Sequence, residues 1–142
     1  MIKTALYSAH ATTTGGRVGK SQTDDGRLSV TLDSPKEMGG NGGPGTNPEQ
    51  LFAVGYSACF LGAVKAVARG EKIAIPDDAT VKATVDFGQQ TNNVGYGIAV
   101  ALEVHIPGLS LGEATELVHK AHQICPYSNA TRGNIDVKLT AV

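Results

Sequence analysis

The chain has 142 residues and a formal net charge of −1, with 18 glycines, three phenylalanines, four tyrosines and no tryptophan. Such a length suits one domain, residues 1–142, built around a single core. The balanced charge argues against a surface for nucleic acid or for an anionic membrane, and the few aromatic side chains leave little with which to stack bases.

The N-terminal part of the chain predicts three strands. Residues 2–10 alternate weakly between apolar and polar side chains, residues 17–22 form a second strand, and residues 28–32 alternate cleanly in a third. Between the last two strands, residues 24–26 (DDG) have the composition of a hairpin turn. Residues 38–46 (MGGNGGPGT) are too rich in glycine for regular structure, so we expect a flexible or tightly looped segment there.

The stretch from Asn47 to Gly70 predicts the helix around which the rest of the chain is organised. Asn47 suits the N-cap, Pro48 the first helical position, and Gly70 the position just past the C-terminus. Residues 51–64 are apolar nearly all the way round, so we expect the helix to be buried on every side. A membrane span is the alternative for so long an apolar segment. Lys65 lies inside the segment, and the sequence contains no second apolar segment of this length. We therefore expect the helix to form the core of a soluble domain, with no membrane as partner.

The second half of the chain predicts a hairpin, a helix and a last strand. Residues 81–87 and 98–106 alternate as two strands on either side of the turn GQQTNN. Ser110 opens a capping box for a second helix, which Pro126 ends. Residues 135–139 alternate as the last strand. The resulting order, βββαββαβ, is an α+β plan with antiparallel sheets.

Both cysteines of the chain, Cys59 and Cys125, fall on apolar faces of these two helices. The sequence before residue 18 has no apolar run of signal-peptide length, so we expect a cytoplasmic protein. In that compartment a pair of cysteines is more often reactive than a permanent disulfide.

Four motifs together resemble a known family. Cys59 in YSACF, Cys125 in ICPYSNATRGNI, the segment PGTNPEQL and an early GGR resemble the organic hydroperoxide resistance proteins, the Ohr branch of the Ohr/OsmC superfamily. The resemblance covers essentially the whole chain, and CPYSNATRGNI is its most specific part. It implies an intertwined homodimer with antiparallel sheets around central helices. It also implies a thiol-dependent peroxidase that acts on organic hydroperoxides, needs no cofactor or metal, and is reduced by a dihydrolipoyl-bearing protein or a small dithiol.

The resemblance also assigns roles to four residues. Cys59 matches the thiol that attacks the peroxide and Cys125 the thiol that resolves the sulfenic acid into an intrachain disulfide. Arg17, in the GGR turn, matches the arginine that activates the attacking thiol, and Glu49, in NPEQ, the carboxylate that holds this arginine. Without the resemblance, Arg17 would be interpreted as a solvated charge at a strand end, and Glu49 as a favourable acid in the first turn of a helix.

The chemistry explains why such an arginine is needed. A cysteine attacks as its thiolate, and burial in an apolar helix raises the pKa of the thiol. A guanidinium at about 4 Å, with an effective dielectric constant near 20, contributes about 4 kcal/mol in favour of the thiolate. That free energy equals about three pKa units, enough to offset moderate desolvation.

The spacing of Glu49 and Cys59 points to a second copy of the chain. Ten residues of straight helix span about 15 Å, so one arginine cannot easily contact both side chains of the same helix. Two antiparallel copies of the helix would bring Glu49 of one chain near Cys59 of the other. We therefore expect a site assembled across a dimer interface.

Two alternatives from other classes rest on the same cysteines. His119, His122 and Cys125 are spaced by threes on one predicted helix and could begin a metal site, although this spacing rotates off a single face and no fourth ligand is evident. A non-catalytic binding module would use Cys59 and Cys125 only as core filler, which is the usual role of buried thiols.

Two further alternatives are enzymes. A cysteine hydrolase would pair Cys59 with His10 or His105. A peroxidase of the OsmC branch would use the same two thiols but accept a broader range of peroxides.

Overall fold

A computed structural model describes residues 2–142, and by internal contacts the chain divides into two compact units, Met1–Pro48 and Glu49–Val142. The interpretation of residues 1–142 as one domain stays a prediction.

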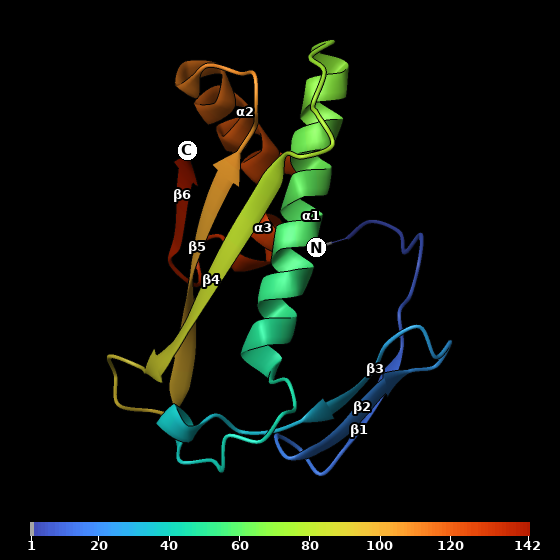
Figure 1. Cartoon of the computed structure of the whole chain (residues 1–142), viewed down its shortest axis with the longest axis vertical. Coiled ribbons are helices and arrows are strands. Elements are labelled where there is room, and N and C mark those ends of the chain that lie inside the picture. The colour runs from blue at the N-terminus through green and yellow to red at the C-terminus, as the bar shows by residue number, and fades with distance from the viewer. Residues whose placement is uncertain (1) are drawn as a thin grey trace. The chain divides into compact units, whose positions relative to one another are not determined.

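The first unit contains a three-stranded antiparallel sheet (Figure 1). Its strands are β1 (Ala11–Thr14), β2 (Gly19–Thr23) and β3 (Ser29–Leu32), in the order β1-β2-β3. The predicted first strand at residues 2–10 is wrong, because pairing begins only at Ala11. The large apolar side chains of that segment are exposed, and Leu6 is 97% exposed.

The glycine-rich loop after β3 is tightly wound around one carboxylate. It starts with a single 3-10 turn, η1 (Lys36–Met38). The backbone N–H of Gly45 donates to Asp33 Oδ2 over 2.6 Å, and a Cβ at either Gly43 or Gly45 would lie 2.6 Å from the same oxygen. Thr46 closes the loop, because its backbone N–H donates to the Thr31 carbonyl. Glycine is therefore required here, because the backbone approaches Asp33 closely. Of the two predicted forms, a flexible segment or a tight loop, the structure has the tight loop.

Helix α1 (Pro48–Gly70) begins at the predicted proline, and its predicted existence and length are confirmed. The expectation that it is buried on every side is not met within one chain, since the elements of the chain cover only part of its surface. Val54 is 67% exposed. The buried side of the helix consists of Tyr56, Phe60, Ala63, Val64 and Ala68.

Among residues 2–142, α1 is also the one helix long and apolar enough to cross a membrane by length and composition. The core helix of a soluble protein meets the same criterion. In this chain the buried side of α1 belongs to the main hydrophobic cluster together with residues of strands and of a second helix. That packing accounts for the apolar character of its buried side.

The second unit is built on the sheet β4-β5-β6. Strands β4 (Thr80–Gln89) and β5 (Tyr96–His105) form the predicted long antiparallel hairpin. Strand β6 (Val137–Ala141) instead pairs parallel to β5, with Val137 opposite Val100. The prediction of antiparallel sheets is therefore wrong for this pair. The reason is the connection, because the chain crosses over through helices between β5 and β6, as parallel pairing requires.

Two helices form that connection. Helix α2 (Leu111–Ile124) begins with the predicted capping box, in which the Ser110 hydroxyl accepts from the Glu113 backbone N–H and the Glu113 carboxylate accepts from the Ser110 backbone. Pro126 ends α2 as predicted. It also starts a short helix that was not predicted from the sequence, α3 (Pro126–Thr131). Pro126 is the first residue of this helix, which is the helical position where proline is best tolerated.

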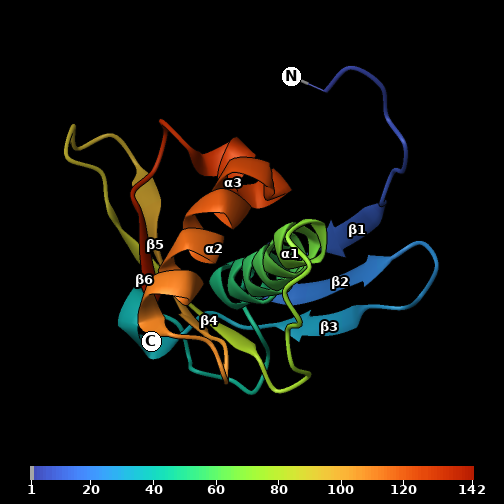
Figure 2. The same ribbon diagram turned by 90° about the horizontal axis from the view of Figure 1, so that it is seen from above.

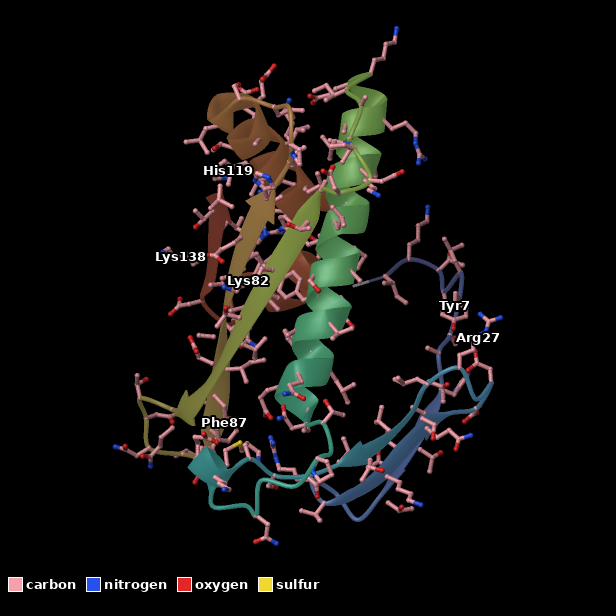
Figure 3. The ribbon with its side chains drawn as sticks, viewed as in Figure 1. Tyr7, Arg27, Lys82, Phe87, His119 and Lys138 are labelled. Carbon is pink, nitrogen blue, oxygen red and sulfur yellow. The ribbon has the colours of Figure 1, made fainter. Side chains whose placement is uncertain are left out.

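Helices α1 and α2 lie on the same side of the β4-β5-β6 sheet (Figure 1 and Figure 2). The other face of the sheet is charged and exposed. Lys82 of β4 pairs there with Glu103 of β5 at 3.4 Å, and Figure 3 labels both Lys82 and Lys138, which lies on β6, beyond β5. The buried face supplies Leu102 and Val104, both fully buried, to the core shared with the helices.

Candidate active site

The two thiols of the chain meet in the second unit. Cys59 lies in the middle of α1 and Cys125 at the end of α2, and their Sγ atoms are 3.5 Å apart. Both are free thiols, and the Cys125 S–H donates toward Cys59 Sγ. A disulfide requires about 2.05 Å between the sulfurs, so a modest movement of either side chain would join them. The fold thus brings together two predicted site residues that are far apart in the sequence.

The two thiols differ in their access to solvent. Cys59 is partly exposed, whereas Cys125 is fully buried. A reagent from solvent therefore reaches Cys59 first. Cys125 lies behind it, within contact of the sulfur that would be oxidised.

Cys125 is held at a sharp junction between helices. It is the last capping residue of α2 and the first of α3, with extended dihedrals (φ −63°, ψ 124°). Pro126 favours this conformation, because the residue before proline avoids helical dihedrals. The Cys125 backbone still serves both helices: its N–H donates to the Ala121 carbonyl and its carbonyl accepts from the Asn129 N–H, each over 2.9 Å.

Burial of Cys59 disfavours its thiolate. Burial is the largest effect and raises the pKa of the Cys59 thiol, and the neighbouring Cys125 raises it further. The backbone N–H of Tyr127 donates toward the sulfur and lowers the pKa, but by less than the burial raises it. A nearby cation would favour the thiolate, which is the form that attacks.

Buried hydroxyl groups connect α1, which carries Cys59, to α3, which begins directly after Cys125. The Tyr56 hydroxyl lies 3.0 Å from Ser128 Oγ and 3.2 Å from Thr131 Oγ1, so α1 and α3 are joined by hydrogen bonds in the core. The ring of Tyr127 lies across α1 at Gly55, where a Cβ would come within 2.6 Å of the tyrosine oxygen. Gly55 therefore permits the close approach of α3.

The buried hydroxyl groups of Ser128 and Thr131 were not predicted from the sequence. Ser128 and Thr131 are fully or almost fully buried, which is unusual for hydroxyl residues. A signal was present in the motif CPYSNATRGNI, where polar residues directly follow a buried cysteine. What the sequence does not contain is the partner, because Tyr56 lies on another helix.

The two charged residues of the prediction lie apart along the chain. Arg17 is exposed in the turn between β1 and β2, in the first unit. Glu49 is half-buried in the first turn of α1, ten residues before Cys59 on the same continuous helix. The action of either residue on Cys59 stays a prediction.

The histidines of the alternative predictions have other surroundings. His105 Nδ1 lies 2.9 Å from the Val142 carbonyl oxygen at the end of β5, and His10 belongs to the first unit. Within residues 2–142, no group of three or more His, Cys, Asp or Glu side chains, including the set His119, His122 and Cys125, is placed to hold a metal ion.

Comparison of the sequence with known proteins gives matches that all lie in one family. The family model described as OsmC-like protein matches residues 39–140. An organic hydroperoxide resistance protein of Xanthomonas axonopodis pv. citri is 55% identical over 135 residues, which cover 95% of this chain and 94% of that protein. The organic hydroperoxide resistance protein OhrB of Bacillus subtilis is 45% identical over 95% of this chain and 97% of its own length.

Solved structures agree with these similarities. A crystal structure described as an organic hydroperoxide resistance protein OsmC, from Legionella pneumophila, superposes with a TM-score of 0.91 at 48% identity and covers 97% of this chain and 98% of that one. The crystal structure of B. subtilis OhrB superposes with a TM-score of 0.89 at 44% identity and covers 97% of this chain and 100% of that one.

Proposed function

Because the chain belongs to the OsmC-like protein family, and within it to the organic hydroperoxide resistance proteins, we propose that it is a cysteine peroxidase that reduces organic hydroperoxides to alcohols. Family membership supports a role in resistance to organic hydroperoxides. The thiol mechanism rests on one observation of this chain, the 3.5 Å contact between the sulfurs of a partly exposed and a buried cysteine.

The first step uses Cys59. Its thiolate attacks the terminal oxygen of the hydroperoxide, an S–O bond forms and the O–O bond breaks. The leaving alkoxide takes a proton and departs as the alcohol, while Cys59 becomes a sulfenic acid. The partial exposure of Cys59 supports this role, because the peroxide must reach the sulfur.

The second step uses Cys125. Its sulfur attacks the sulfenic sulfur of Cys59, an S–S bond forms, and the hydroxyl group leaves as water with the thiol proton. Contact between the sulfurs supports a fast step, since little movement is needed. Burial of Cys125 keeps it from competing for the peroxide.

Arg17 and Glu49 complete the proposed site. Burial raises the pKa of Cys59, so ionisation needs a positive charge, and a guanidinium can supply it while it also forks to a carboxylate. Arg17 is assigned as this cation and Glu49 as the carboxylate that orients it. Because Glu49 and Cys59 are separated along one continuous helix, the site is proposed to form between the chains of an intertwined homodimer.

A dithiol completes the cycle. It attacks the Cys59–Cys125 disulfide by thiol–disulfide exchange, passes two electrons and two protons to the protein, and leaves as its own disulfide. The proposed reductant is a dihydrolipoyl-bearing protein or a small dithiol, and the proposed location is the cytoplasm. No cofactor is required by these steps.

Rapid mixing of the fully reduced protein with an alkyl hydroperoxide, and separately with hydrogen peroxide, tests the function. We expect two thiols per chain to be lost in each completed reaction, faster with the alkyl hydroperoxide. Equal rates with both peroxides would favour a peroxidase of broader specificity. Retention of both thiols with either peroxide would refute the proposal and favour a non-peroxidase role.

A further inference from the structure

Arg132 joins the two helices that meet at Cys125. It follows α3 as its C-cap, and its guanidinium folds back over the junction. Nη1 donates to Asn129 Oδ1 of α3 over 2.9 Å, and Nη2 donates to the backbone carbonyl of His122 on α2. The two acceptors lie on opposite sides of Cys125 along the chain.

The sequence explains why the His122 carbonyl needs this donor. In a continuing helix, that carbonyl would accept from the N–H four residues later, which is the position of Pro126. Proline has no N–H, so the same residue that turns the chain at Cys125 leaves the carbonyl without its helical partner. A cation at the C-terminal end of α2 is also favourable with the helix dipole. Arg132 thus replaces the bond that Pro126 removes.

We propose that Arg132 is a positioning residue for the resolving thiol. Its two-armed bridge fixes the angle between α2 and α3, and this angle decides where Cys125 Sγ lies relative to Cys59 Sγ. Its importance for turnover rests on the proposed function. Its effect on the distance between the thiols does not, so the two can be tested separately.

The test compares Arg132→Gln with Lys120→Met. Lys120 is also on α2 and anchors it through Glu71 at 2.5 Å, so the control removes a charged side-chain contact of α2 that is directed at Glu71 and not at the residues of α3. Each variant is equilibrated with reduced and oxidised dithiothreitol, which exchanges two electrons and two protons with the thiol pair. The fraction of Cys59–Cys125 disulfide measures how well the fold holds the two sulfurs together.

We expect Arg132→Gln to lower this equilibrium constant about tenfold, which corresponds to about 1.4 kcal/mol. Lys120→Met should leave it within about twofold, since the Lys120 side chain contacts Glu71 and the Arg132 side chain contacts His122 and Asn129. Arg132→Lys keeps the charge but not the fork, so it should recover only part of the loss. An equilibrium constant for Arg132→Gln equal to that of the parent would overturn the proposal, and so would full recovery with lysine.

Asn129→Ala keeps the test decisive if Arg132→Gln does not fold. It removes one arm of the bridge, so a smaller fall in the same constant is expected, and no change would again overturn the proposal. Reaction with an alkyl hydroperoxide supplies the second measurement. Arg132→Gln should oxidise Cys59 at the parent rate but form the disulfide more slowly, with more sulfenic acid trapped. If the parent does not react with the peroxide, the proposed function fails, while the equilibrium still decides the role of Arg132.

Discussion

The hydroxyl oxygens of Tyr56 and Ser128 lie 3.0 Å apart in the core, and this contact links the middle of α1 to α3. Tyr56 is one helical turn before Cys59. Ser128 is on the first turn of the helix that follows Cys125. A buried polar contact therefore links the helix that carries Cys59 to the helix that begins directly after Cys125.

Tyr56→Phe should destabilise the fold by about 1–2 kcal/mol, because it removes a buried hydrogen-bond partner and leaves the Ser128 hydroxyl without one of its contacts. Urea denaturation measures the change. Tyr96→Phe is the matched control, since Tyr96 is 67% exposed and should be nearly neutral. Equal stabilities for the parent and Tyr56→Phe would show that the contact contributes nothing net.

The two cysteines should fail in different ways. Cys59→Ser should abolish consumption of the peroxide, because the attacking thiolate is gone. Cys125→Ser should still allow one oxidation of Cys59, seen as trapped sulfenic acid, but turnover with a dithiol should slow and sulfinic acid should accumulate. Loss of the first oxidation step in both variants would contradict the assignment of attacking and resolving thiols.

Arg17→Ala should raise the pKa of the Cys59 thiol by at least about one unit, which corresponds to 1.36 kcal/mol of lost thiolate stabilisation. Burial already raises this pKa, so little thiolate would then remain at neutral pH. Thiolate absorbance against pH, in a Cys125→Ser background, measures the shift. Arg17→Lys should recover part of it.

Arg27→Ala is the matched control for this titration, because Arg27 is an exposed arginine of the same unit that pairs with Asp25 at 3.6 Å. Its titration curve should match that of the parent. An Arg17→Ala curve that superimposes on the parent curve would show Arg17 to be only a charge at a strand end.

The exposed side of α1 should mediate dimerisation. Val54 is an apolar residue of this helix and is 67% exposed in the single chain. Val54→Asp places a charge in the proposed interface, so the variant should sediment as a monomer at micromolar concentration. Leu111→Asp, at a 63% exposed position of α2, should remain dimeric. A parent that sediments as a monomer would refute the dimer.

Stability should fall in mild acid because of His122. Burial, followed by the charges of Arg132 and His119, lowers the pKa of His122, so the folded state disfavours its protonation. The unfolded chain protonates near pH 6.5 and binds more protons there, so stability is present above that pH and is lost as the pH falls through the folded pKa. His122→Gln should flatten this dependence in urea denaturation between neutral and mildly acidic pH. His10→Gln, at an exposed position, is the control and should leave the dependence as in the parent.

Local patterns were sufficient to predict α1, the hairpin β4–β5 and the start and end of α2. Caps, proline positions and the two-residue period of strands depend on neighbours in the sequence, so they can be predicted without the fold. The two cysteines and the family motifs could also be identified from the sequence alone. The weak alternation of residues 2–10 misled the prediction, because a period alone does not supply a pairing partner.

Other features depended on contacts between distant parts of the chain. The parallel pairing of β6, the polar contact of Tyr56 with Ser128 and the 3.5 Å between the sulfurs all join segments far apart in sequence. The role of Pro126 shows the division most clearly. Its effect on the end of α2 is local and was predicted. The hydrogen bond that its missing N–H leaves open at the His122 carbonyl is instead made by the guanidinium of Arg132, after α3. This contact could be found only in the folded structure.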